Sequence, residues 1–188
     1  MSERYTEEWV ASLLDVDKRF GAAGPGELLA GAAPGATVVD YGCGPGYFTL
    51  AAARMVGPAG KVYAVDLEPR MVELVRRRAA EAGLANVAAV ASDGTRADLP
   101  DAVADYIICV QIMHYAEGRG DRVAIARDLS RLLNAGGSVL IAQWKPKRRA
   151  SGLPYDELSG ILAEAGLAAS GARSMTDELY YTIARRSP

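Results

Sequence analysis

The sequence predicts a doubly wound α/β fold, in which helices pack on both faces of a mostly parallel sheet. Short β-branched or apolar runs alternate with longer stretches whose apolar residues recur three and four positions apart, the spacing of a helix with one buried face. The segments between successive runs are long enough for parallel crossovers, which need a dozen or more residues. A glycine-rich turn directly follows the first run, as at the ligand-binding edge of such sheets.

The expected elements follow one another along the chain. An amphipathic helix over 6–20 precedes a glycine-rich break and a short helical piece around Leu28 and Leu29. The pattern predicts strands at 37–41, 61–66, 87–92, 105–110 and 138–143, with helices at 47–56, 69–83 and 120–134. Strands 168–174 and 179–185 are separated only by 175–178. This connection is too short for a parallel crossover, so these two strands must pair antiparallel if they are neighbours.

The turn after the first strand carries glycine at every second position, Gly42, Gly44 and Gly46. Glycine permits positive φ and close backbone approach, and a helix beginning near Tyr47 directs unpaired amides at the same point, which predicts a site for an anionic group. The dinucleotide fingerprint requires its third glycine where Tyr47 stands, so the spacing argues against a nicotinamide or flavin site. The alternative is a turn whose glycines only let a strand and a helix pack closely.

Carboxylates follow the second and third predicted strands. Asp66 closes the second strand, and Asp93 lies in Ser92-Asp93-Gly94 after the third. Because the carboxyl ends of parallel strands meet at one edge of the sheet, Asp66 is expected beside the glycine turn, where it can accept hydrogen bonds from ribose hydroxyls. The alternative role for Asp66 is a helix cap before Pro69.

Length and composition predict one domain over 1–188, with a helical leader or lid over 1–34 and the α/β core over 35–188. The formal net charge is −2, which supplies no global attraction to nucleic acid. No apolar run approaches the ~20 residues of a membrane span, and the acidic start of the chain is unlike a signal peptide. These features predict a cytoplasmic location.

Other polar groups are less informative about function. Cys43 and Cys109 lie far apart and the chain has a single histidine, so neither a disulfide framework nor a metal site is expected. The arginines at 76–78 spread around one helix and predict a solvated face rather than a nucleic-acid patch. The basic segment 145–149 follows the fifth strand, either as a solvated loop or as a guide for an anionic acceptor or RNA.

Four features together resemble the class I S-adenosylmethionine-dependent methyltransferases: segment 38–46, Asp66, Ser92-Asp93-Gly94 and the terminal hairpin. The resemblance extends from residue 28 onward, and segment 132–137 is most similar to the branch that methylates quinones and other small metabolites. It implies a Rossmann-like doubly wound sheet of seven strands in the order 3-2-1-4-5-7-6, with the seventh strand antiparallel.

The resemblance also implies S-adenosylmethionine as cofactor and assigns the parts of its site. Gly42, Gly44 and the loop backbone would hold the methionine part, and Asp40 would orient its ammonium. Asp66 would accept the ribose hydroxyls. The remaining implied positions are Leu67 and Met71 around the adenine, Asp93 and the Gly94 backbone at its amino edge, and the Val110 backbone near the amine or sulfonium.

The predicted reaction is in-line transfer of a methyl group to a small-molecule acceptor, without a metal. An RNA or protein methyltransferase, a nucleotide-binding oxidoreductase and a non-catalytic binding module are the alternatives. No catalytic residue is assigned, because His114 fits either a general base or a structural histidine. Cys43 and Cys109 fit core positions, which argues against an arsenite-methylating enzyme with its several thiols.

The acceptor and the oligomeric state are not defined by the sequence. Aromatic residues suit either a lid over a flat apolar acceptor or simple core positions, and these residues are Tyr5, Trp9, Phe20, Tyr115 and Trp144.

Overall fold

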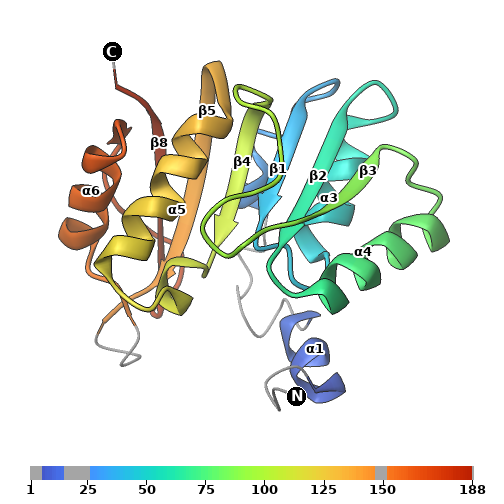
Figure 1. Ribbon diagram of the computed structural model, residues 1–188, viewed down its shortest axis with the longest axis horizontal. Coiled ribbons are helices and arrows are strands. Elements are labelled where there is room, and N and C mark those ends of the chain that lie inside the picture. The colour runs from blue at the N-terminus through green and yellow to red at the C-terminus, as the bar shows by residue number, and fades with distance from the viewer. Residues whose placement is uncertain (1–5, 15–25, 147–151, 188) are drawn as a thin grey trace.

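One mixed sheet with helices on both faces forms the centre of the protein (Figure 1). The computed structural model describes residues 6–14, 26–146 and 152–187. The strands are β1 (Thr37–Tyr41), β2 (Lys61–Asp66), β3 (Val87–Ala91), β4 (Ala104–Val110), β5 (Leu133–Trp144), β6 (Leu167–Ala169), β7 (Arg173–Ser174) and β8 (Leu179–Arg186). The helices are α1 (Glu7–Leu14), α3 (Tyr47–Val56), α4 (Pro69–Glu81), α5 (Arg119–Leu132) and α6 (Tyr155–Glu164), with 3₁₀ turns η2 (Gly26–Leu29) and η3 (Met113–Tyr115).

The strand order is β3-β2-β1-β4-β5-β8-β6, and β7 also pairs with β8. The first five strands pair in parallel, whereas β8 runs antiparallel to β5, β6 and β7. The predicted fold class and strand order are therefore confirmed, with β8 in the place of the seventh strand. The winding changes direction between β1 and β4, and in such sheets ligands bind at that point, beyond the carboxyl ends of the strands.

Two buried layers hold the helices against the sheet. On one face the apolar side chains of β1, β4 and β5, such as Val39 and Ile107, pack with those of α5 and α6. The other face buries Val38 and Ile108 against α3 and η2, while Val75 of α4 packs on Ala64 of β2. Both faces of the central strands are covered, which is why β4 reads as a continuous apolar run.

The structure corrects three element boundaries. The single strand expected over 168–174 is two strands, β6 and β7, interrupted at 170–172, where Gly171 has a φ of 95°. Helix α5 passes directly into β5, which begins at Leu133 and contains a register shift opposite β4. Gly136, at a φ of 87°, lies within this irregular part of the strand and lets the backbone turn back into register.

Two further differences concern helices. The sequence prediction did not include α6, although Leu158, Ile161 and Leu162 follow helical spacing and are buried. The helix expected over 6–20 is described only as α1, and 15–25 lie outside the described residues. The lid role of 1–34 stays a prediction. Among the described helices, none has the length and apolarity that crossing a membrane requires.

Candidate cofactor site

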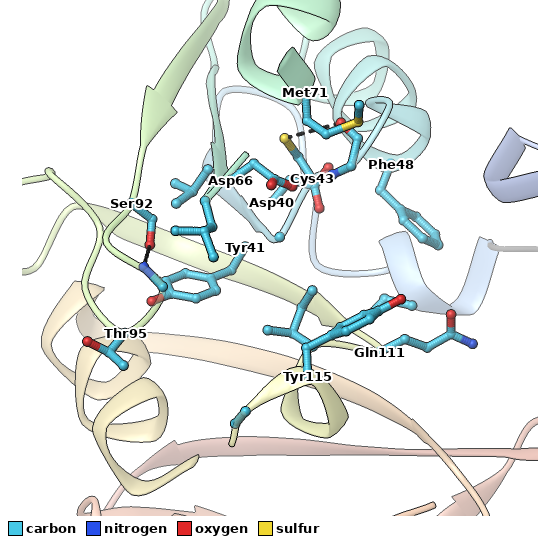
Figure 2. A pocket seen from close by; sticks show the side chains of 18 of the residues that line it. Asp40, Tyr41, Cys43, Phe48, Asp66, Met71, Ser92, Thr95, Gln111 and Tyr115 are labelled. Carbon is cyan, nitrogen blue, oxygen red and sulfur yellow. Dashed lines mark hydrogen bonds between the residues drawn. The ribbon is translucent and has the colours of Figure 1, made fainter. Parts of the chain in front are cut away.

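A cavity of about 460 Å³ opens at the carboxyl ends of β1, β2 and β4, where the winding changes direction (Figure 2). The residues that the resemblance implies come from five separate segments, and all of them line this cavity: Asp40, Gly42, Gly44, Asp66, Leu67, Met71, Asp93, Gly94 and Val110. The structure thus brings together every position in the predicted set. Their roles in binding stay predictions.

The glycine turn adopts the backbone that its sequence predicts. Gly42, Gly44 and Gly46 have φ values of 77°, 50° and 87°. A Cβ on Gly42 would lie 2.0 Å from Cδ1 of Ile112, and a Cβ on Gly46 would lie 2.8 Å from Cγ2 of Val75. Gly42 therefore leaves room for the side chain of Ile112, which lines the cavity, and Gly46 lets the turn pack on α4.

Four backbone amides of the turn donate to groups of the protein itself. The amides of Gly42 and Cys43 both donate to the Val65 carbonyl, at 2.8 and 2.9 Å, and the Gly46 amide donates to the Cys43 carbonyl. The Gly44 amide donates to Oδ2 of Asp66 at 2.8 Å. The turn runs past the end of β2, where Val65 and Asp66 accept three of these bonds, so these four amides do not form an anion site.

Asp40 is the most buried carboxylate of the cavity, with 2% of its surface exposed. Its Oδ2 accepts a hydrogen bond of 2.5 Å from the hydroxyl of Thr49, which the first turns of α3 place beside the end of β1. Burial raises the pKa of Asp40 to about 7, the Thr49 hydroxyl opposes this rise, and the charge of Asp66 adds to it. A cation bound nearby would favour the ionised form.

Asp66 joins the glycine turn to the start of α4. One carboxylate oxygen accepts from the Gly44 amide and the other accepts from the Glu68 amide at 2.9 Å. Burial raises the pKa of Asp66, and these two backbone bonds oppose the rise. The N-cap of α4 is Glu68, whose side chain accepts from the Arg70 amide, so the cap alternative for Asp66 is not what the structure shows. Each Asp66 oxygen retains further acceptor capacity for a hydroxyl group.

Asp93 belongs to a tight turn after β3 and is exposed at the cavity rim. Its Oδ1 accepts from the Thr95 amide at 2.8 Å, the Thr95 hydroxyl at 3.0 Å and the Arg96 amide at 2.7 Å. These bonds lower the pKa of Asp93 and hold its carboxylate in one orientation. The Gly94 amide donates to the Ser92 hydroxyl, drawn in Figure 2.

Apolar side chains complete the rim. Leu67 and Tyr115 are 58% and 54% exposed and line the cavity from the segments after β2 and β4, while Met71 and Phe48 line it from buried positions. Gln111 follows β4 with a φ of 60°, an uncommon value outside glycine, and lines the cavity with 6% exposure. The rim thus offers a slot for a flat apolar group.

Known proteins show which family shares this arrangement. The methyltransferase domain family matches residues 38–137, which contain the glycine turn and the segments that follow β2, β3 and β4. The chain belongs to this methyltransferase family. The curated relatives of this chain include the arsenite methyltransferase of Halobacterium salinarum, 30% identical over 100% of the chain and 48% of that protein. The ubiquinone/menaquinone biosynthesis C-methyltransferase UbiE of Pseudomonas putida is 30% identical over 70% of the chain and 51% of that protein.

The chain spans about half the length of these curated relatives. Among solved structures, a SAM-dependent methyltransferase from Aquifex aeolicus superposes with a TM-score of 0.80 at 26% identity, covering 96% of this chain and 98% of that one. The whole mixed sheet, with its antiparallel β8, is therefore the architecture that this relative also has.

Charge distinguishes the cavity from a phosphate site. Five carboxylates line it, and the described lining contains no lysine, arginine or histidine; the carboxylates are Asp40, Asp66, Asp93, Glu117 and Asp121. A negative cavity attracts cations and disfavours a pyrophosphate. Within the described residues, no group of three or more histidine, cysteine or acidic side chains is arranged to hold a metal ion.

The sequence analysis missed several of the residues that shape the cavity. Thr49 gave no signal beyond its place near the start of a helix, and its contact with Asp40 depends on the packing of α3 against β1. Gln111 and Glu117 follow the continuous apolar run of β4, and no sequence pattern marks them as cavity residues.

The structure also places the other candidate residues. His114 is not among the residues that line the cavity, and its ring packs against Tyr115 with 4.0 Å between ring centroids, which favours the structural role. Cys109 is fully buried and Cys43 is 6% exposed, as expected for core positions. Trp144 is buried in the core rather than in a lid, whereas Tyr5, Phe20 and the Trp9 side chain lie outside the described residues.

The arginine and lysine predictions have mixed outcomes. Arg76 and Arg77 form exposed ion pairs with Glu73 and Glu81, in agreement with a solvated face. Arg78 instead donates to the Pro45 carbonyl and holds α4 to the glycine turn.

The basic segment 145–149 is only partly described. The ammonium of Lys145 donates to the Ser174 hydroxyl at 2.8 Å and to the Thr176 carbonyl at 2.6 Å. The hydrogen bonds of Lys145 thus connect the end of β5 to the terminal hairpin. The rest of the segment, 147–149, lies outside the described residues.

Proposed function

We propose that this protein transfers a methyl group from S-adenosylmethionine to a small, flat and apolar acceptor. The observation that carries the proposal is a ligand-sized cavity lined by five carboxylates, without a cationic side chain in its described lining. S-adenosylmethionine bears a sulfonium and an ammonium against one carboxylate, so its net positive charge suits such a cavity. The relatives named above support the same cofactor.

The proposed site divides the cofactor among three groups of residues. Asp40, beside Asp66 at the strand ends, receives the ammonium, because burial disfavours its ionised form and a cation nearby restores it. The two oxygens of Asp66 accept the ribose hydroxyls. Leu67 and Met71 flank the adenine, while Asp93 and the Gly94 backbone face its amino edge.

The sulfonium supplies an activated methyl group, so the protein's main contribution is alignment and exclusion of water. Val110 and Gln111 bring the end of β4 to the cavity and place the acceptor side opposite the glycine turn. Phe48 and Tyr115 supply apolar surface for the acceptor. No general base is required by this scheme, in agreement with the position of His114 outside the lining.

The rim and the cysteine content of the chain both bear on the class of acceptor. Curated relatives named as quinone C-methyltransferases and an arsenite methyltransferase cover different acceptors. The chain has two cysteines, both buried and separated in sequence, so a set of thiols for arsenite is missing. We therefore favour a quinol-like acceptor in the cytoplasm over arsenite, RNA or protein.

A titration followed by a transfer assay tests the proposal. Calorimetry with S-adenosylmethionine should give saturable binding, and NADH should give none. Labelled methyl should then pass to a demethylated naphthoquinol, and neither arsenite nor bulk tRNA should be labelled. Binding of NADH without S-adenosylmethionine would contradict the cofactor assignment, and label in tRNA alone would support the RNA alternative.

A further inference from the structure

A buried carboxylate outside the cavity lining makes contacts on three sides. Asp128 of α5 is 4% exposed. Its Oδ2 accepts from the Tyr41 hydroxyl at 3.1 Å and from the Ala97 amide at 2.7 Å. Its Oδ1 lies 2.8 Å from Nε and 2.7 Å from Nη2 of Arg131. Asp128 thus links β1, α5 and the segment that follows β3.

Arg131 extends this linkage along the same segment. Its guanidinium donates to the carbonyls of Ala97 and Leu99, at 3.0 and 2.7 Å, and to the Asp101 carboxylate at 2.8 Å. The amide of Ala97 is therefore held by Asp128, and its carbonyl by Arg131. Two side chains one turn apart on α5 therefore fix the backbone N–H and the backbone carbonyl of Ala97.

The fixed residue closes the turn that carries Asp93. Ser92 and Ala97 form an isolated antiparallel bridge, and the Asp93 amide donates to the Arg96 carbonyl at 3.1 Å. The bonds from Thr95 and Arg96 to the Asp93 carboxylate lie inside this closed turn. A shift of Ala97 would consequently move Asp93 relative to the cavity.

Tyr41 connects the same carboxylate to the cavity itself. Its ring lines the cavity beside Ser92 and Thr95, as Figure 2 shows, and its hydroxyl donates to Asp128. Burial and then the charge of Asp128 raise the pKa of the Tyr41 phenol above its usual range, so the phenol stays a donor. A buried ion pair is weak evidence for a purely stabilising role, because its desolvation cost offsets much of the attraction.

We propose that Asp128, together with Arg131, is a positioning residue that sets the Asp93–Gly94 turn for the adenine of the cofactor. This inference rests on the proposed function. Asp128 touches neither cofactor nor acceptor and acts through the Ala97 amide. An asparagine at position 128 would place its NH₂ group against either the Ala97 amide or Arg131. Because both of these are donors, one of the two hydrogen bonds must be lost.

The test compares Asp128→Asn with a matched control on the same arginine. Asp101→Asn removes an exposed partner of Arg131 that makes no described contact with residues 92–97. Calorimetry with S-adenosylhomocysteine should show about tenfold weaker binding for Asp128→Asn and a change within about twofold for Asp101→Asn. Equal affinities of Asp128→Asn and wild type would overturn the positioning role.

A double-mutant cycle with Asp93→Ala separates positioning from general stability. If Asp128 acts through the Asp93 turn, Asp128→Asn should weaken binding by only about twofold or less once Asp93 is alanine. An undiminished tenfold loss in that background would show that Asp128 acts elsewhere and would overturn the inference. A flat wild-type isotherm would overturn the cofactor assignment as well, which distinguishes the two failures.

Tyr41→Phe provides a second test of the same inference if Asp128→Asn does not fold. This variant retains the ring that lines the cavity and removes only the hydroxyl bonded to Asp128. Binding of S-adenosylhomocysteine should weaken by about threefold, the loss of one modest hydrogen bond. Unchanged affinity of Tyr41→Phe would also count against the proposed role.

Discussion

The floor and the rim of the cavity are built in different ways. The floor consists of strand ends and the glycine turn, where Asp40 and Asp66 accept hydrogen bonds from neighbouring protein groups. The rim includes exposed side chains such as Leu67 and Tyr115, which are more than half exposed. The difference indicates that the floor serves both the fold and the ligand, whereas these exposed rim side chains serve the ligand. Substitutions should therefore separate into two classes.

The largest effect is expected from Asp66→Asn on the floor. An asparagine there directs its NH₂ group toward the amide of Gly44 or Glu68 and accepts hydroxyls less well than a carboxylate. Affinity for S-adenosylhomocysteine should fall about tenfold to a hundredfold, and unfolding free energy should fall by about 1–2 kcal/mol. Calorimetry and urea unfolding measure the two quantities. Loss of stability with affinity unchanged within twofold would contradict the ribose role.

Gly42→Ala should have the next largest effect, and Gly35→Ala is its control. Both glycines have nearly the same φ, 77° and 79°, but a Cβ on Gly35 meets nothing within 4 Å while one on Gly42 overlaps Ile112. Both variants should lose about 1 kcal/mol from backbone strain. Only Gly42→Ala should also bind S-adenosylhomocysteine about tenfold more weakly, since it moves Ile112 into the cavity. Equal binding by the two variants would show that the position of the Ile112 side chain does not affect the ligand.

Thr49→Val should have a smaller effect that depends on pH. The Thr49 hydroxyl lowers the pKa of Asp40, so its removal raises that pKa further. If the pKa of Asp40 rises by about one, the ionised fraction of Asp40 at pH 7 falls from about a half to about a tenth. Affinity should then fall about fivefold. The loss should shrink as the pH rises. A loss of equal size at pH 6 and pH 8 would contradict this explanation.

Leu67→Ala on the rim should have the smallest effect and should leave the fold unchanged. Because Leu67 is 58% exposed, its truncation removes little buried surface from the free protein. S-adenosylhomocysteine should bind about threefold more weakly, with thermal unfolding unaltered, since the side chain is buried only against the ligand. A clear fall in melting temperature would remove the distinction between floor and rim.

Most of the floor could be predicted from the sequence. Strand periodicity located the ends of β1 and β2, and parallel pairing then placed Asp66 beside the glycine turn. The positive φ of Gly42, Gly44 and Gly46 followed from the spacing alone. The hydrogen-bond partners did not follow, because the amides of Gly42 and Cys43 bond to a carbonyl of another strand, which no local pattern reveals.

The rim and its support could be predicted only in part. Leu67, Asp93 and Gly94 came from the family resemblance, and all three line the cavity. The Asp128–Arg131 pair lies on a helix with ordinary amphipathic spacing, so only the packed structure shows its contact with Ala97. Acidic and arginine residues on a helix usually indicate a solvated face, which is why the sequence pattern did not single them out.

The raised pKa of Asp40 makes both the stability of the free protein and its affinity for ligand depend on pH. The pKa of Asp40 is about 7 in the folded protein and 3.8 in its ordinary state, so between these values the folded protein binds more protons than the unfolded chain. The contribution of Asp40 to the stability of the free protein therefore falls as the pH rises from about 4 to about 7. Binding of an ammonium beside Asp40 requires the ionised form, so ligand affinity should rise over the upper part of the same range.

The affinity of S-adenosylhomocysteine as a function of pH, for wild type and Asp40→Asn, tests most directly whether the cavity carboxylates hold the cofactor. Calorimetry from pH 5.5 to pH 8 keeps the ligand's own ammonium charged. With a pKa of about 7 for Asp40, wild type should bind about tenfold more weakly at pH 6 than at pH 8. Asp40→Asn should bind weakly with little change across the range. A wild-type affinity that is flat or falls with rising pH, or an Asp40→Asn variant that keeps the wild-type dependence, would contradict the account.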